Sequence, residues 1–210
     1  MRILFALLLL LATPLQAQSN RSGNFDYYVL SLSWSPNWCA ETGDARKEAQ
    51  CDASKDYGWT LHGLWPQNEK GWPSFCKTSM RPPSRALTNS MVDVMGSSGL
   101  AWYQWKKHGS CTGLSAKEYF RLSRLAYEQV NRPQIFRRLT QDIKLPAKVV
   151  EEAFMEANPK LLQNQITITC KSRRIQEARL CLTRDLTPRK CGVDVIRDCT
   201  LPDAVMSPVR

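Results

Sequence analysis

The sequence lacks the features that mark membrane, repeat and metal-binding proteins. Its longest apolar run, residues 3–11, is too short to span a bilayer, and no later run approaches that length. No repeat, linker or low-complexity segment interrupts the 210 residues. The cysteines form no Cys-x-x-Cys pair, and neither histidine is spaced with a cysteine as metal ligands usually are. We therefore expect one domain without a membrane-inserted segment, a metal site or a cofactor.

The N-terminus has the pattern of an export signal. Arg2 supplies a positive charge, residues 3–11 supply the apolar run, and Leu15-Gln16-Ala17 ends in a small residue that suits cleavage. This pattern predicts a signal peptide at residues 1–17 and a mature domain at residues 18–210. We expect that domain to be exported, either to the periplasm or out of the cell, and to be a monomer.

The eight cysteines all fall in the predicted mature domain. They are Cys39, Cys51, Cys76, Cys111, Cys170, Cys181, Cys191 and Cys199. An even number in an exported protein predicts four disulfides. The short separation of Cys39 and Cys51 favours that pair, while the spacing leaves the other pairings open.

The chain is basic, with a formal net charge of +10. The basic residues cluster at Lys106-Lys107, Arg137-Arg138, Lys171 with Arg173-Arg174, and Arg189-Lys190. Such clusters attract polyanions, although each alone could be a solvated face. The seven tryptophans favour nucleic acid as the partner, because aromatic rings stack on bases.

The hydrophobic pattern changes period along the chain, from strand to helices and back to strands. Alternating and branched residues predict strands at 25–33, 165–170, 178–183 and 193–196. We expect loops at 39–51 and 67–83, and helices at 85–95 before Gly96, at 100–107, after the Ser115–Glu118 capping box, and from Pro133 and Pro146. This order predicts an α+β fold, with a mainly antiparallel sheet packed against helices.

Only two histidines occur, and each is followed by glycine in a stretch that contains tryptophan. His62 lies in WTLHGLWP, residues 59–66, and His108 lies in WKKHGSC, residues 105–111. Histidine is the side chain best suited to act as acid or base near neutral pH. Either residue alone could be a packing or turn residue. The shared context makes both of them candidates for proton transfer.

Residues 100–107 are expected to end a helix directly before His108. Helical spacing then places Gln104 one turn before His108, and Tyr103 one turn before Lys107. Two histidines and a lysine suit in-line phosphoryl transfer on RNA: one imidazole takes the 2′-hydroxyl proton, the other protonates the leaving 5′-oxygen, and the lysine steadies the phosphoryl charge. These residue types alone do not distinguish RNA from another ester.

At these two stretches the sequence resembles the ribonuclease T2 family of exported acid endoribonucleases. WTLHGLWP is similar to the family's first active-site segment and WKKHGSC to its second, and the likeness extends from the strand at Phe25 to Cys199. The resemblance implies an α+β fold. It also implies metal-independent cleavage of single-stranded RNA through a 2′,3′-cyclic phosphate to 3′-phosphate ends. The two-histidine scheme requires a 2′-hydroxyl, so we expect no cleavage of DNA.

The resemblance also implies roles for individual residues. His108 matches the general base, His62 the general acid and Lys107 the phosphate-stabilising lysine. Trp65 matches an aromatic residue of a base pocket, and Trp72 lies near a second one. For both tryptophans, packing in the core is the alternative.

Three positions depart from the family pattern, and each departure bears on activity or base preference. Many members have His-Glu where this chain has Tyr103-Gln104. The Tyr103 hydroxyl and the Gln104 amide can still donate hydrogen bonds to a phosphate, so the substitutions weaken activity without excluding it. Gln67 stands where some members have an acidic base-reading residue, which leaves the base preference open.

The same resemblance implies three of the four disulfides. It pairs Cys76 with Cys111, which would tie the two active-site segments together. It also pairs Cys170 with Cys199 and Cys181 with Cys191, and leaves Cys39 for Cys51. The sequence thus predicts an active extracytoplasmic endoribonuclease. The alternative is a weakened or non-catalytic protein that binds RNA or another polyanion on the same scaffold, because Gln104 replaces the glutamate.

Overall fold

A computed structural model describes residues 21–210, so the predicted signal peptide lies outside the described residues. Within residues 21–210 a single sheet contains six strands, in the order β2-β1-β5-β6-β3, with β4 also paired to β5. The strands are β1 (Tyr27–Trp34), β2 (Trp59–Gln67), β3 (Ile143–Leu145), β4 (Ile166–Lys171), β5 (Arg174–Leu182) and β6 (Ala204–Met206). All pairs are antiparallel except β5 with β6. The predicted α+β fold with a mainly antiparallel sheet is confirmed.

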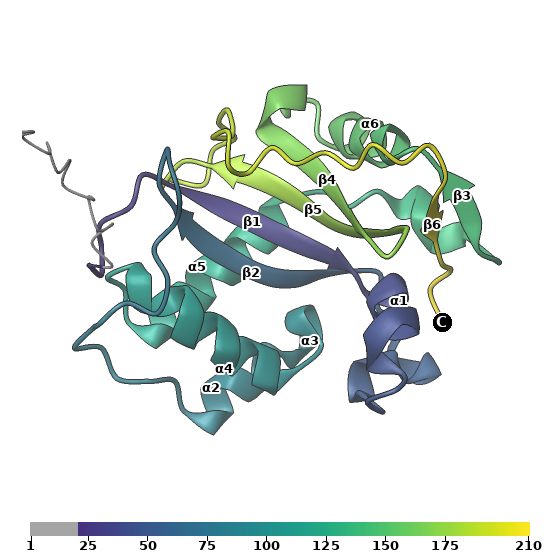
Figure 1. Cartoon of the computed structure of the whole chain (residues 1–210). Helices are drawn as coiled ribbons and strands as arrows, with labels where there is room; N and C mark the ends of the chain where they lie inside the picture. Colours follow the sequence, from purple (N-terminus) through teal and green to yellow (C-terminus); the bar gives the residue numbers. More distant parts are fainter. Residues whose placement is uncertain (1–20) are drawn as a thin grey trace, which may run out of the picture.

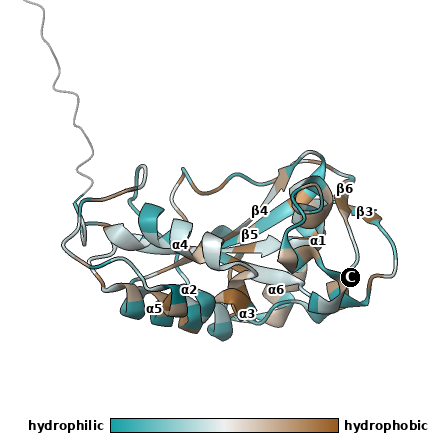
Figure 2. Ribbon diagram, turned by 90° about the horizontal axis from the view of Figure 1, so that it is seen from below, coloured by the Kyte–Doolittle hydropathy of each residue, from teal (hydrophilic) through white to brown (hydrophobic). Residues whose placement is uncertain are grey.

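Helices cover one face of the sheet and extend beyond its β2 edge. They are α2 (Arg85–Asn89), α3 (Val92–Met95), α4 (Ser98–Lys107), α5 (Ala116–Gln129) and α6 (Ala147–Ala157), while the short α1 (Ser35–Trp38) continues from the end of β1. Figures 1 and 2 show α5 and α6 behind the sheet, with α2, α3 and α4 grouped beside β2. The mixed colouring of α5 in Figure 2 is that of an amphipathic helix with one side on a core.

The main core lies between the sheet and the helices behind it. Leu30 and Leu32 of β1 alternate with residues of the opposite face, and they are paired with Leu64 and Leu61 of β2. All four leucines are fully buried against helix residues such as Phe154. Full burial of a leucine contributes about 1.5–3 kcal/mol, so this leucine ladder fixes the register of β1 and β2.

Most of the predicted helices are present, with changes at their ends. Ser115 and Glu118 form the expected capping box of α5. The helix expected at 85–95 is two short helices, α2 and α3, and Gly96 ends the second in a left-handed conformation with φ 77°. Pro133 and Pro146 each lie just before a helix instead of being its first residue, because their extended ψ angles of 117° and 141° do not continue into a helix.

Two expectations about strands and loops were wrong, and β2 was not predicted. Residues 193–196 form a turn, in which the Val195 N–H donates to the Gly192 carbonyl, and Val193 is 76% exposed. The segment 39–51 is not a plain loop, because Cys39–Gly43 form a π-helical turn after α1. The segment 59–66, to which we assigned no structure, is most of β2.

Four disulfides join the described cysteines: Cys39–Cys51, Cys76–Cys111, Cys170–Cys199 and Cys181–Cys191. They are the pairs that the resemblance implies. Cys76 is in the loop after β2, so its bridge connects that loop, not the His62 strand itself, to the turn after His108. Between residues 21 and 210, no helix combines the length and apolar character needed to cross a bilayer.

Candidate active site

A β-bulge turns His62 away from the core. Ser31 of β1 pairs with Gly63 and Leu32 pairs with Leu61, so His62 is the extra residue between two regular pairs. In an unbroken strand His62 would share the core face with Leu64, because side chains alternate. The bulge instead lets Leu61 and Leu64 both face the core while His62 lies on the opposite face, near Trp65.

His108 reaches the same place from the end of α4. Its backbone N–H donates to the Gln104 carbonyl at 2.9 Å, and the helix ends at this residue. Its imidazole stacks on Trp65, with ring centroids 5.2 Å apart and planes at 23°, while His62 meets Trp65 edge-on at 5.3 Å. The two histidines, 46 positions apart in the sequence (108 − 62), therefore flank one tryptophan.

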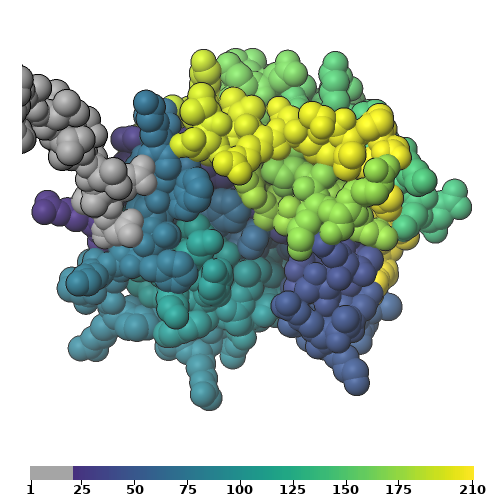
Figure 3. Space-filling view, viewed as in Figure 1, coloured from purple at the N-terminus to yellow at the C-terminus, as the bar shows by residue number. Residues whose placement is uncertain are grey.

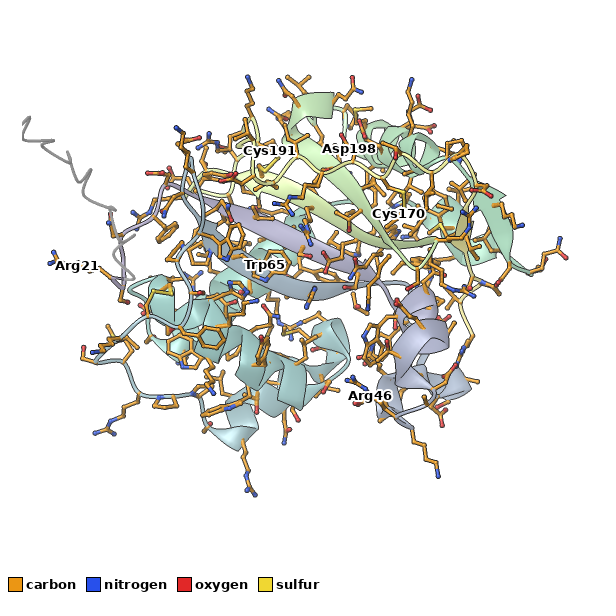
Figure 4. All side chains as sticks on the ribbon, in the orientation of Figure 1. Arg21, Arg46, Trp65, Cys170, Cys191 and Asp198 are labelled. Carbon is orange, nitrogen blue, oxygen red and sulfur yellow. A yellow bond between two sulfur atoms is a disulfide. The ribbon has the colours of Figure 1, made fainter. Side chains whose placement is uncertain are left out.

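These rings line a cavity of about 390 Å³. Figure 3 shows the face hollowed between α4, β5 and the yellow segment after Cys191, and Figure 4 labels Trp65 in this region. All eight non-cysteine residues that the sequence proposed for the site line this cavity: His62, Trp65, Gln67, Trp72, Tyr103, Gln104, Lys107 and His108. The structure thus brings together every one of them.

The cavity also contains four charged residues that we did not predict. They are Glu177 and Arg179 of β5, and Asp194 and Arg197 of the segment after Cys191. With Lys107, the wall has three cationic and two anionic side chains besides the histidines. For Glu177 and Arg179 the sequence did offer a signal. Opposite charges at alternate positions are typical of the polar face of a strand.

Glu177 lies against His62. Its side chain is 2% exposed, and its Oε1 contacts His62 Nδ1, while Arg179 Nε donates to its Oε2 at 2.8 Å. Burial raises the pKa of Glu177, but the charges and hydrogen bonds of His62 and Arg179 outweigh burial and hold it at about 2. The carboxylate is therefore ionised, and the hydrogen of the contact is assigned to His62 Nδ1. His62 Nε2 is the ring nitrogen left for a substrate.

His108 is held in its uncharged form. It is 6% exposed, and burial, together with the nearby charges of Lys107 and His62, lowers its pKa to about 3. Its Nδ1 is buried without a hydrogen-bond partner among the described residues. A neutral imidazole that lines a cavity can accept a proton, as a general base must.

Comparisons with known proteins identify the family. The profile of the Ribonuclease T2 family matches residues 25–191. A protein named Ribonuclease from Aeromonas hydrophila is 31% identical over 198 residues, which cover 90% of this chain and 88% of that protein. The chain belongs to the ribonuclease T2 family.

Further relatives and solved structures are consistent with that membership. Ribonuclease I of Escherichia coli is 29% identical over 149 residues, which cover 52% of this chain and 55% of that enzyme. An RNase-related protein from Calystegia sepium has the same fold, with a TM-score of 0.65 at 21% identity, covering 88% of this chain and 97% of its own. As a T2-family member, the chain is an endoribonuclease.

At position 104, where the resemblance implies glutamate in many members, this chain has glutamine. Gln104 is 1% exposed, and its Oε1 accepts a 2.8 Å hydrogen bond from Trp65 Nε1. Gly63 makes this bond possible, because a Cβ there would collide with both partners. The amide oxygen therefore orients Trp65 between the histidines.

Tyr103 and Lys107 lie at the outer wall of the cavity. Tyr103 is 46% exposed, and the Lys107 ammonium lies 5.9 Å from the centre of its ring. The Lys107 carbonyl accepts a hydrogen bond from the Phe75 N–H at 2.8 Å. The loop that contains Phe75 and Cys76 thereby holds the last turn of α4, from which Lys107 extends.

The two remaining predicted residues differ in their exposure. Trp72 is 48% exposed, which excludes the core-packing alternative for this residue. Gln67 is buried, and its Nε2 donates to the Gly71 carbonyl at 3.0 Å, while the Gly71 N–H donates to Asp194. Gln67 therefore fixes the turn that presents Trp72 to the cavity.

One group of possible metal ligands lies elsewhere in the described residues. Cys39, Asp44 and Cys51 have ligand atoms within 4.8 Å of one another. The two sulfurs form a disulfide, so neither is a thiolate that could bind a metal ion.

Proposed function

We propose that this T2-family chain is an exported endoribonuclease that cleaves single-stranded RNA without a metal ion. The observation that carries the proposal is the shared cavity, in which His62 and His108 flank Trp65 beside Lys107. Export is supported by the signal-like N-terminus and by four disulfides, which persist in oxidising compartments. A solved structure of the same fold, RNase NT, is in complex with 5′-AMP, which supports a nucleotide ligand.

In the proposed first step His108 accepts the proton of the ribose 2′-hydroxyl. The 2′-oxygen then bonds to phosphorus, the bond from phosphorus to the 5′-oxygen breaks, and His62 Nε2 gives its proton to that oxygen. Lys107 lies where it can stabilise the charge on the phosphoryl oxygens. In the second step water opens the 2′,3′-cyclic phosphate to a 3′-phosphate, with the two histidines in reversed roles.

We expect the mature protein to degrade single-stranded RNA in the presence of EDTA and to leave DNA intact, because DNA has no 2′-hydroxyl. Gel analysis with end-group mapping should show cyclic-phosphate ends first and 3′-phosphate ends later. Cleavage of DNA, or a need for added divalent metal, would contradict the mechanism. Binding of RNA without cleavage would favour the non-catalytic alternative.

We expect Gln104→Glu to raise the cleavage rate near neutral pH. A carboxylate one helical turn from His108 raises the pKa of that histidine from its low value, which makes it a stronger base. Because a base with a higher pKa becomes protonated at a higher pH, the acidic limb of the rate profile should also move upward in pH. The measurement is kcat/KM from acidic to neutral pH.

The control for this substitution is Gln104→Ala, which removes the hydrogen-bond acceptor of Trp65. This variant should cleave more slowly than the wild type at every pH, with no upward shift of the acidic limb. If all three proteins share one profile, position 104 has no role in catalysis.

A further inference from the structure

Glu177 is a buried carboxylate for which the two-histidine mechanism alone gives no role. It is 1% exposed in a strand whose neighbouring residues on the core side, Ala178 and Leu180, are apolar. Removing a carboxylate from water is costly unless charged or hydrogen-bonding partners compensate. Its two partners are His62 and Arg179, one at each oxygen. The burial of Glu177 is therefore explained by the two side chains that its carboxylate binds, His62 and Arg179.

The contact with His62 is possible because of two serines in the strand between them. His62 is in β2 and Glu177 is in β5, and β1 lies between these strands, so the two backbones are roughly 10 Å apart. On this face β1 presents Ser31 opposite Arg179 and Ser33 opposite Glu177. Ser31 is fully buried. A small side chain at each position leaves room for the glutamate and the bulged histidine to meet above β1.

The contact also fixes the imidazole. With the ionised carboxylate at Nδ1, the ring cannot rotate to exchange its two nitrogens without losing the hydrogen bond. Arg179 donates to the other oxygen of Glu177 through Nε at 2.8 Å and a terminal nitrogen at 2.6 Å, which holds the carboxylate in turn. The series His62–Glu177–Arg179 thus resembles the arrangement in which a carboxylate orients a catalytic histidine.

We propose that Glu177 is the positioning residue of His62, directing Nε2 toward the leaving 5′-oxygen and stabilising the positive charge of the protonated ring. This inference rests on the proposed function. The carboxylate that contacts a histidine of the site then lies on β5 beside the general acid, whereas position 104 on α4, beside the base, has an amide. The predicted defect of a Glu177 variant is therefore confined to protonation of the leaving group.

A change of leaving group tests this role. In RNA the 5′-oxygen must be protonated as it leaves, whereas 4-nitrophenolate leaves from uridine 3′-(4-nitrophenyl phosphate) without a proton. We expect Glu177→Gln to reduce kcat for RNA by about 10- to 100-fold, the usual cost of losing a partner that orients a functional side chain, and to change kcat for the aryl ester less than about 3-fold. An equal loss on both substrates, or no loss on RNA, would overturn the proposal.

A double-mutant cycle tests whether Glu177 acts through His62. In a His62→Ala background the Glu177→Gln substitution should have no further effect on RNA cleavage, because the group that it positions is absent. If Glu177 serves only to hold Arg179, the two effects should multiply. That outcome would reject the proposal.

Two further variants guard against a trivial loss of folding. Glu177→Asp keeps the charge but withdraws it by one methylene, so it should show the same selective defect to a smaller degree, and it replaces Glu177→Gln if that protein does not fold. Glu151→Gln removes another buried carboxylate, which is 6% exposed, lies on α6 and does not line the cavity, and should leave both activities unchanged. A wild type that cleaves neither substrate would refute the proposed function. A wild type that cleaves both, with Glu177→Gln equally active, would refute only the role of Glu177.

Discussion

Replacing either histidine with alanine is expected to reduce RNA cleavage by at least ~10²-fold, since each proton transfer contributes about 10²–10⁴ to the rate. The two variants should differ with an activated substrate. His108→Ala removes the base, so it should also fail on uridine 3′-(4-nitrophenyl phosphate). His62→Ala removes only the acid, so it should retain most of its activity on that ester. Steady-state kcat on both substrates is the measurement.

A lysine pair in α4 supplies the matched control for these variants. Lys107 lines the cavity, whereas its neighbour Lys106 is exposed and does not. Lys107→Ala should slow cleavage of both substrates, because both carry the phosphoryl charge that it stabilises, and Lys106→Ala should not. Full activity of His62→Ala and His108→Ala on RNA would refute the two-histidine mechanism. If His62→Ala and His108→Ala were equally active on RNA and also equally active on the aryl ester, the two histidines would not have separate acid and base roles.

The residues that the sequence proposed for the site lie together in one cavity, and part of the signal for them is local. His62 and His108 share a context of tryptophan and glycine, and the turn from Gln104 to His108 follows from helical spacing alone. The capping box at Ser115 is likewise read from four consecutive residues. Features of this kind need no knowledge of the partner strands.

The features that complete the site are not local. The bulge at His62 exists because Leu61 and Leu64 both pair with leucines of β1, and no residue of β2 alone indicates that register. Glu177 was outside the predicted strand, which began at Ala178, and its partner lies 115 residues away. The turn at 193–196 has strand-like composition, but hydrogen bonds from Gly71 to Asp194 and from Gly192 to Tyr27 fix it as a loop over the sheet.

Removing the Cys76–Cys111 bridge is expected to reduce both stability and activity. The bridge closes a separation of 35 residues. In the loop-entropy model this corresponds to roughly 4 kcal/mol of unfolding free energy at 25 °C. Activity should fall as well, because the bridge joins the loop after β2 to the turn after His108, and the neighbouring Phe75 N–H donates to the Lys107 carbonyl. The test is Cys76→Ala with Cys111→Ala, measured by urea unfolding and by kcat.

The Cys39–Cys51 bridge provides the matched comparison for this prediction. It closes a separation of 12 residues, worth roughly 3 kcal/mol in the same model, and neither cysteine lines the cavity. Cys39→Ala with Cys51→Ala should therefore lose nearly as much stability while the kcat of the folded protein is unchanged. Equal kcat for the two double variants, measured where both are folded, would show that Cys76–Cys111 stabilises the chain without holding Lys107 and His108 in place.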